Sequence, residues 1–501
     1  MHLAFVRTRS QSGLSALPVT VEIHMSSGLP AFQVVGMSDA ASREIRSRVR
    51  SAIVSSHLKW PDYNIAVNLA PTDHPKQGAG FDLPIAIGLL LASGQLPSEA
   101  ARDREFLGEL GLDGAIRPAR GALAATLATT TDQRDLCVAR EGAAQLAAVA
   151  GSRIIAATDL LTLCAALKEP EPDLTRAADI LVTQPSYPDL SQIKGQSSLC
   201  RALELAAAGG HHLLMTGPPG VGKTLSASVL AGLLPELDPA TQEELWLLRD
   251  LVGLPPTHHP EFRAPHHSSS IAALIGGTAR ATPGEISMAH GGVLFLDELT
   301  EFPRAVLNQL RQPLESGEIC VSRAEHQHRY PARFQLVAAM NPCPCGFAGS
   351  DEQHCRCTPD RIWRYRQGVS GPLLDRIDLH ITLSKPASTH LLSHRQEQDA
   401  SHSARERVAH ARRKQQARQG CPNRDLAGDG LLDACALSSG TRTWFGEVLE
   451  KMKLSARSAH RRLRVARTIA DMNESEGVTR EHIYAALSYR EMPDGAAGTR
   501  Y

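Results

Sequence analysis

The sequence predicts an α/β fold: an α/β core, followed by a helical domain and preceded by a smaller α+β domain. Two observations predict it. Between residues 190 and 390, short apolar runs of strand length alternate with helical stretches, the order typical of a sheet covered by helices. From residue 395 to 490 the pattern is helical throughout.

The chain before residue 170 mixes the two kinds of element. Val19–His24 and Tyr63–Leu69 alternate or run apolar as strands do, whereas Ile85–Ala92 and Ala122–Ala128 have helical composition. Lys168–Pro188 is rich in proline and acidic residues and indicates a linker.

We therefore predict three domains, since one domain usually takes roughly 100–200 residues. Their boundaries are expected at 1–170, a linker at 171–190, a core at 191–390, and a basic connector with helices at 391–501.

Composition narrows the class of protein. The 501 residues carry zero formal net charge and 42% hydrophobic residues, so no global field attracts nucleic acid or membrane, and such contacts need local basic patches. No run approaches the ~18 apolar residues that span a bilayer, and no signal peptide pattern opens the sequence, so we expect a cytoplasmic protein. Ten cysteines should be reduced there, so a tight cysteine cluster indicates a metal before a disulfide.

A glycine-rich motif follows the apolar run His211–Thr216. It has the form G-x-x-x-x-G-K-T, in which backbone N–H groups surround phosphate, the lysine contacts the β- and γ-phosphates and the threonine hydroxyl ligates Mg²⁺. A helix starting after it would direct its N-terminal dipole at the same anion. The predicted ATP-binding residues are Gly217, Pro218, Pro219, Gly220, Val221, Gly222, Lys223 and Thr224.

Two acids end the next buried run, Val293–Leu296. Asp297 is expected to share Mg²⁺ with Thr224, and Glu298 to polarise the attacking water. Two solvated acids at a strand end are the alternative, but the position about seventy residues after the glycine-rich motif favours the catalytic interpretation.

Phe334–Ala339 predicts a third strand, which leads to Met340 and Asn341. The Asn341 amide could orient water beside the γ-phosphate, although asparagine alone is more often a turn former. Arg376 has two possible roles: a local ion pair with Asp375 or Asp378, or an arginine finger at a neighbour's γ-phosphate.

Leu454–Arg457 opens a predicted helix with basic residues three and four apart. That spacing places Arg457, His460, Arg461 and Arg464 on one face. For Arg461 and Arg464 we expect a solvated basic face.

Several stretches together resemble one family, the magnesium-chelatase-like AAA+ proteins of the ComM/YifB type. Together with the N-terminal stretches described below, they extend across nearly the whole chain. The combination of the His-His-Ser and Cys-Pro-Cys-Gly stretches is specific to this family. The matching stretches are Gly217–Thr224, Phe262–Ser268, Pro283–Ser287, Gly292–Leu299, Leu310–Glu315, Asn341–Gly346, Ser370–Asp378 and Leu454–Asp471.

The resemblance implies roles that spacing leaves open. It places Asn341 at the sensor-1 position, Arg376 at the arginine finger and Arg457 at the sensor-2 arginine. It also implies an AAA+ P-loop core with a C-terminal helical lid, Mg²⁺ and ATP as cofactors, and a homo-oligomeric ring, expected to be a hexamer. Proteins of the ComM type resemble motors that drive DNA branch migration in natural transformation.

The N-terminal residues resemble the proteolytic domain of Lon (a ribosomal S5 domain 2-like fold) and the C-terminal domain of RadA. Asn68–Pro84, Phe106–Leu110 and Gly114–Pro118 carry this likeness. Lon-type peptidases use a serine that follows a Pro-Lys-x-Gly turn, and a lysine that acts as its base. Here the turn reads Gly78-Ala79-Gly80 and no lysine lies between Gly114 and Arg140, so we expect a domain without the catalytic dyad, used for assembly or for guiding DNA.

Four cysteines follow Asn341 in two pairs, Cys343-x-Cys345 and Cys355-x-Cys357. Four thiolates can enclose one structural Zn²⁺, although C-x₂-C is the more usual spacing and His354 could replace one thiolate. Free, partly buried cysteines are the alternative.

Two loops are candidates for DNA contact. Gly276–Gly284 carries Arg280, and Val321–Arg329 has the pattern of a hairpin that carries Arg323 and Arg329. Ordinary solvated loops explain both equally well. Excess basic residues between His394 and Arg424 could bind phosphate or lie on a solvated helix. His266 and His267 could contact phosphate or DNA, or take part in hydrogen-bonded packing, and we do not assign them as metal ligands.

The expected function is an ATP-driven DNA motor that acts on single-stranded, forked or branched DNA. Three alternatives share its ATPase residues: a magnesium-chelatase motor subunit, an ATP-dependent protease and a nucleotide-dependent scaffold. The chelatase alternative leaves the Lon-like domain and the cysteines unexplained, and the protease alternative lacks its serine and lysine. The scaffold alternative stays open, because switches and motors carry the same hydrolysis residues.

Overall fold

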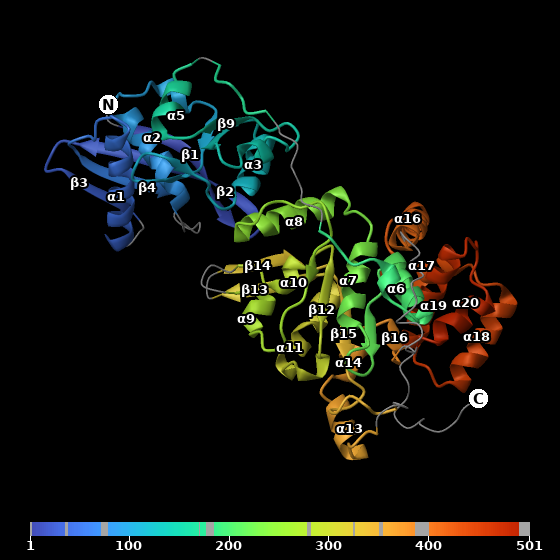
Figure 1. Ribbon diagram of the computed structural model, residues 1–501. Coiled ribbons are helices and arrows are strands. Elements are labelled where there is room, and N and C mark those ends of the chain that lie inside the picture. The colour runs from blue at the N-terminus through green and yellow to red at the C-terminus, as the bar shows by residue number, and fades with distance from the viewer. Residues whose placement is uncertain are drawn as a thin grey trace. The chain divides into compact units, whose positions relative to one another are not determined.

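The computed structural model describes residues 3–35, 39–71, 79–169, 171–176, 185–277, 282–323, 326–349, 354–385 and 400–489. The chain divides into two compact units, which Figure 1 colours along the sequence. The first contains Met1–Thr183 and Glu243–Pro256, and the second contains Gln184–Gln242 and Thr257–Tyr501. Across the described ranges, no helix has both the length and the apolar character needed to cross a bilayer.

A mixed seven-stranded sheet organises the first unit, in the order β3-β4-β2-β1-β5-β8-β9. The hairpin β1–β2 and the pair β2–β4 are antiparallel, and the remaining neighbours are parallel. Its strands are β1 (Leu3–Ser12), β2 (Ser15–Ser26), β3 (Ala31–Val35), β4 (Asn64–Ala70), β5 (Arg104–Phe106), β8 (Asp135–Ala139) and β9 (Ile154–Ala157), with a separate ribbon of β6 (Glu109–Leu110) and β7 (Ile116–Arg117).

The helices of the first unit are α1 (Asp39–Ser55), α2 (Asp82–Ala92), α3 (Ala122–Thr131), α4 (Ala143–Leu146) and α5 (Leu160–Ala166). Helix α2 is buried along almost its whole length, because its residues are apolar on every side. Its Gly88 allows close packing, since a Cβ there would lie 2.7 Å from Cγ1 of Ile23. The four elements expected before residue 130 are thus present as β2, β4, α2 and α3.

The second unit contains a parallel five-stranded sheet in the order β11-β12-β15-β10-β16. Because all strands run the same way, the residues that follow them meet at one edge. The strands are β10 (Leu213–Thr216), β11 (Phe262–Arg263), β12 (Val293–Leu296), β15 (Gln335–Met340) and β16 (Leu379–Thr382). The three strands expected from sequence are β10, β12 and β15, and they are adjacent in the sheet.

Helices connect these strands, and a hairpin precedes β15. The helices are α6 (Ser197–Gly209), α7 (Lys223–Leu233), α8 (Pro239–Val252), α9 (Ile271–Ile275), α10 (Glu285–Met288), α11 (Arg304–Gln309), α12 (Arg311–Ser316), α13 (Pro359–Arg366) and α14 (Gly371–Leu374). The hairpin, β13 (Glu318–Arg323) and β14 (His326–Pro331), confirms the one predicted around Val321–Arg329. Helix α8 starts in the second unit, and its residues from Glu243 onward belong to the first.

The described residues 400–489 form five α-helices, as expected: α16 (Ala400–Gln419), α17 (Gly428–Cys435), α18 (Ser439–Lys451), α19 (Ala456–Met472) and α20 (Arg480–Leu487). Their apolar residues share one core with α6, α7 and β10. Inside that core, buried Arg467 pairs with buried Asp471 one turn later (2.9 Å).

Candidate nucleotide site and cysteine cluster

The glycine-rich motif lies between the buried strand β10 and helix α7. Gly220 and Gly222 have φ angles of +79° and +89°, a backbone region that side chains rarely adopt. Gly222 is the residue before α7, so Lys223 and Thr224 occupy the first turn of that helix. This arrangement exposes backbone N–H groups and the positive end of the helix dipole to one point, as phosphate binding needs.

Lys223 lies against the residues expected to surround phosphate. Its Nζ donates to the Gly217 carbonyl (2.6 Å) and to Oδ1 of Asn341 (2.8 Å). Burial lowers the pKa of Lys223, while Asp297 and Glu298 act in the opposite direction. The first residue after β15 and the lysine after β10 therefore meet at the same edge of the sheet.

The two acids after β12 lie at that edge as well. The Thr224 hydroxyl donates to Oδ2 of Asp297 (2.8 Å), so the two expected Mg²⁺ ligands are in contact. Both groups are oxygen donors of the kind Mg²⁺ takes, and the pair fits that ion. Glu298 has a left-handed backbone (φ 51°), unusual for a residue with a side chain, and its side chain is 53% exposed.

His267 is a neighbour of Glu298 that the sequence did not predict. Its Nδ1 lies 3.4 Å from Oε2 of Glu298, and its ring is tilted by 34° against that of His266, with centroids 4.1 Å apart. His266 in turn is held by Ser268, whose hydroxyl lies 2.7 Å from its Nδ1. The His-His-Ser stretch is the signal in the sequence, but only the fold shows which acid it approaches.

Arg376 and Arg457 lie together, and their described contacts do not include the glycine-rich motif. Both donate to Oε1 of Glu315 on α12, Arg457 at 3.5 Å. The local pairs considered for Arg376 are taken by other groups: Asp375 accepts from Arg461 (3.0 Å) and Asp378 contacts His211 (3.2 Å). The acidic partner of Arg376 is thus Glu315, which is distant in sequence and which the sequence did not predict.

These residues border a cavity of about 890 Å³ in the second unit. Six arginines line it: Arg333, Arg376, Arg424, Arg457, Arg461 and Arg464. The solvated face expected for Arg461 and Arg464 is wrong. Arg461 is buried and donates to the Ile377 carbonyl (3.1 Å), and Arg464 donates to the Leu426 carbonyl (2.7 Å), because α19 packs against the rest of its unit along this face.

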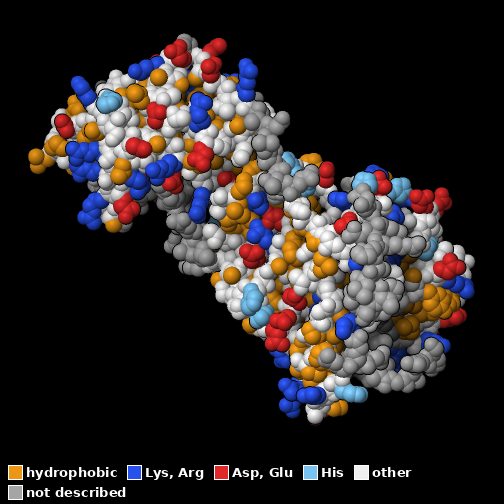
Figure 2. All heavy atoms as spheres, in the orientation of Figure 1, with side chains coloured by type: hydrophobic (Ala, Val, Ile, Leu, Met, Phe, Trp, Pro, Cys, Tyr) orange, Lys and Arg blue, Asp and Glu red, His pale blue; other side chains and the backbone are white. Residues whose placement is uncertain are grey.

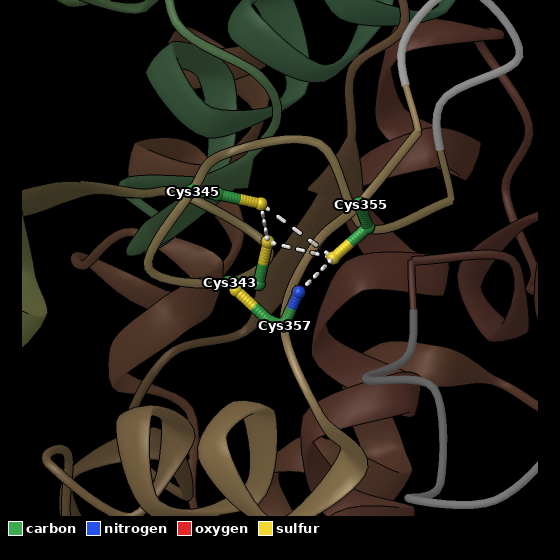
Figure 3. A group of neighbouring side chains, drawn as sticks. All are labelled: Cys343, Cys345, Cys355 and Cys357. Carbon is green, nitrogen blue, oxygen red and sulfur yellow. Dashed lines mark hydrogen bonds between the residues drawn. The ribbon is translucent and has the colours of Figure 1, made fainter.

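The four cysteines after Asn341 form one cluster, shown in Figure 3. The Sγ atom of Cys343 lies 3.3 Å from that of Cys345 and 3.6 Å from that of Cys355, and all four sulfurs lie within 4.8 Å of one another. Four thiolates at ~2.3 Å from one Zn²⁺ would be about 3.8 Å apart, so the donor set fits a tetrahedral zinc site. His354 is not a member of the group.

The cysteine cluster also adjoins the phosphate loop. A Cβ at Gly346 would lie 2.7 Å from Cδ of Pro219, so the two loops are in close packing. Gly346 has φ +84° and follows Cys345 directly, which makes it the residue that allows this approach. A change in the conformation of the cysteine loop can therefore alter the conformation of the phosphate loop through this contact.

Of the candidates for DNA contact, Arg280 lies outside the described residues. Arg323 ends β13, and Arg329 on β14 is exposed. Several basic residues of α16 are used by the fold: Arg407 pairs with Glu204 (2.7 Å), and Arg418 pairs with Asp471 (2.7 Å). These contacts favour a structural role for the basic stretch between His394 and Arg424.

Comparison with known proteins agrees with this geometry. Residues 189–391 match the model of magnesium chelatase, subunit ChlI, and residues 21–142 and 398–490 match two further ChlI models. The uncharacterized protein YifB of Escherichia coli is 42% identical over 98% of this chain and 97% of its own length.

Competence protein ComM of Haemophilus influenzae is also 42% identical, over 98% of each chain. A partial match, 27% identical over 30% of this chain and 32% of the relative, links it to Lon protease 2 of Bacillus subtilis. The chain has the phosphate loop and the paired acids, and it is 42% identical to these relatives over nearly its full length. The chain therefore belongs to the ComM/YifB family of magnesium-chelatase-like AAA+ proteins.

Proposed function

We propose that this chain is an ATP-hydrolysing ring motor that acts on DNA and drives branch migration of recombination intermediates during natural transformation. The observation that carries the proposal is the division of its charged residues between two places. Lys223, Thr224, Asp297 and Asn341 meet at one sheet edge, whereas Arg376 and Arg457 lie together on Glu315. Two half-sites of this kind suit a ring whose subunits complete one another's sites, with six subunits expected for the family.

Within one subunit the groups divide the work. Lys223 would hold the β- and γ-phosphates, and Asn341 would orient the attacking water. Thr224 and Asp297 would hold Mg²⁺, which would neutralise charge on the phosphates. Glu298 would take the proton of the water, and His267, 3.4 Å away, would position its carboxylate.

The two arginines would act on the neighbour's nucleotide. Arg376 would leave Glu315 for the γ-phosphate, and Arg457 would assist from the C-terminal helices, which we assign as the lid. Charge-assisted pairing to phosphate is strong and geometrically specific, so exchange of a carboxylate for a phosphate is favourable only when a neighbour presents ATP. This dependence would link hydrolysis to ring assembly.

For DNA, the hairpin β13–β14 and the loop with Arg280 are the proposed contacts within the core. Arg323 and Arg329 would contact phosphate, so binding should be salt-sensitive and largely independent of sequence. The N-terminal Lon-like domain, without serine and lysine, would serve assembly or DNA guidance. A relative is named a competence protein, which supports a role in DNA uptake.

The central test is a labelled synthetic three- or four-way DNA junction. With ATP, the wild-type protein should convert it to branch-migrated product, while the Lys223→Ala variant should not. The Arg323→Ala, Arg329→Ala variant should lower junction movement more than basal ATPase activity, because the motor would lose its contacts with DNA phosphate. An assembled, ATP-hydrolysing protein that gives equal, negligible product with ATP and with a non-hydrolysable analogue would support the scaffold or the chelatase alternative.

We further propose that the cysteine cluster holds one structural Zn²⁺ in a reducing, cytoplasmic setting. Metal analysis of the purified chain should give about one zinc per subunit, lost in the Cys343→Ser, Cys345→Ser variant, because a closed site needs four ligands. Nucleotide affinity should fall with the metal, since Gly346 packs on Pro219. Cys421→Ser, at a cysteine outside the cluster, is the control. Four freely titratable thiols and no metal would contradict the site.

A further inference from the structure

Helix α1 of the first unit borders a groove of about 630 Å³ that is lined by basic and hydroxyl groups and by no acid. Three arginines, three serines and two exposed apolar residues line it: Arg43, Arg46, Arg50, Ser47, Ser51, Ser55, Val54 and Leu112. In Figure 2, Lys and Arg side chains gather on the surface where Figure 1 places α1. Neither the ATPase site nor the core DNA contacts proposed above use these residues.

The sequence of α1 explains why the arginines face outward. Ile45, Val49 and Ala52 are buried and hold one face of the helix on the core of its unit. Arg43, Arg46 and Arg50 follow one another at spacings of three and four, so they lie on one stripe of the opposite side. Arg43 and Arg50 are exposed and Arg46 is half-buried.

The charges of this stripe are not used by the fold. Among the described residues, no carboxylate pairs with Arg43, Arg46 or Arg50. Arg48 on the same helix is different, because it donates to both oxygens of buried Asp82 (2.7 and 3.0 Å). Glu44 on the same helix lies 4.0 Å from Arg48 and does not line the groove.

Three like charges within two helical turns repel one another, which destabilises a helix that gains nothing in return. A bound polyanion would offset that cost. Ser47 and Ser51 point to the same chemistry, since hydroxyl groups and arginines are common donors to phosphate oxygens. The Ser55 hydroxyl instead donates to the Leu112 carbonyl (2.9 Å). The groove contains no aromatic side chain, so it offers no platform for stacking an unpaired base.

We propose that this groove binds the sugar–phosphate backbone of duplex DNA, as a second contact outside the AAA+ core; the proposal rests on DNA being the motor's substrate. The length of the arginine stripe agrees with the spacing of phosphates along a DNA strand. The seven helical steps from Arg43 to Arg50 rise about 10 Å at ~1.5 Å per residue, and three steps along one DNA strand rise about the same at ~3.4 Å per step. Contact is therefore with successive phosphates and is independent of base sequence.

The test compares the full chain with its Arg43→Ala, Arg46→Ala, Arg50→Ala variant. Fluorescence anisotropy with a labelled 30-base-pair duplex gives the dissociation constant between 50 and 200 mM salt. Loss of three phosphate contacts should make the slope of log affinity against log salt less steep by about 2.7. The ratio of wild-type affinity to variant affinity should therefore fall about 40-fold between 50 and 200 mM salt. ATPase activity without DNA should not change.

Two further variants isolate the groove from total charge. Arg102→Ala, Arg120→Ala, Arg140→Ala removes three exposed arginines elsewhere in the same unit and should keep the wild-type slope. Arg43→Lys, Arg46→Lys, Arg50→Lys should recover most of the salt dependence, because phosphate contact needs the charge more than the guanidinium.

The other outcomes are distinguishable. Wild-type protein that binds no DNA would overturn the proposed function together with the groove. Wild-type protein that binds DNA, with an unchanged slope in the triple alanine variant, would overturn the groove alone. Binding of phosphatidylserine vesicles that only the triple variant loses, with DNA binding intact, would assign a membrane surface. Light scattering that shows loss of assembly would assign a subunit interface.

Discussion

Glu298→Gln is expected to bind ATP as the wild type does and to lose nearly all turnover. Glutamine keeps the size and the hydrogen-bonding reach of Glu298 but cannot take a proton from water. Loss of a positioned base commonly costs about 10²–10⁴ in rate. Binding of a fluorescent ATP analogue and the rate of phosphate release would show the two effects separately.

Matched variants sharpen this result. Lys223→Ala should lose nucleotide binding itself, because its Nζ lies among the phosphate loop carbonyls and Asn341. Glu301→Gln changes an exposed acid three residues after Glu298 and should retain both binding and turnover. A Glu298→Gln protein that hydrolyses ATP at the parental rate would remove the catalytic assignment of Glu298.

The parts of the fold that sequence predicted are the ones with local signals. Apolar runs of four to six residues, each ended by a polar residue, predicted β10, β12 and β15. Because parallel strands end at the same edge, the contact of Lys223 with Asn341 and that of Thr224 with Asp297 follow from the motif order. Gly220 and Gly222 have the positive φ angles that let the glycine-rich motif turn its backbone N–H groups toward phosphate.

The partners across long sequence distances could not be predicted. Glu315 is 61 residues from Arg376 and 142 from Arg457, and nothing in either local pattern selects it. The burial of Arg461 depends on how α19 packs against the rest of its unit. Helical spacing predicts only which residues lie on the same face, and not what that face contacts. For the cysteines, the tight C-x-C spacing weakened the match to a zinc site, and only the fold shows that Cys355 and Cys357 lie beside the first pair.

Arg376→Ala should reduce ATPase activity by about 10³ or more, the loss seen when an arginine that stabilises transferring phosphate is absent. Nucleotide binding should be kept, because Arg376 contacts Glu315 and Pro372 and not its own phosphate loop. Arg361→Ala, at an exposed arginine on α13, is the control and should keep its activity.

Mixing subunits decides whether Arg376 acts on its own nucleotide or on that of a neighbour. Arg376→Ala subunits keep Lys223, and Lys223→Ala subunits keep Arg376, so an interface that joins them in the right order has one complete site. In rings mixed at equal amounts, roughly one quarter of the head-to-tail interfaces would have that order, and ATPase activity should recover in proportion. Neither variant alone can form such a site. Absence of recovery at every mixing ratio, from rings shown to contain both subunits, would mean that Arg376 is a structural partner of Glu315 and that the composite site does not exist.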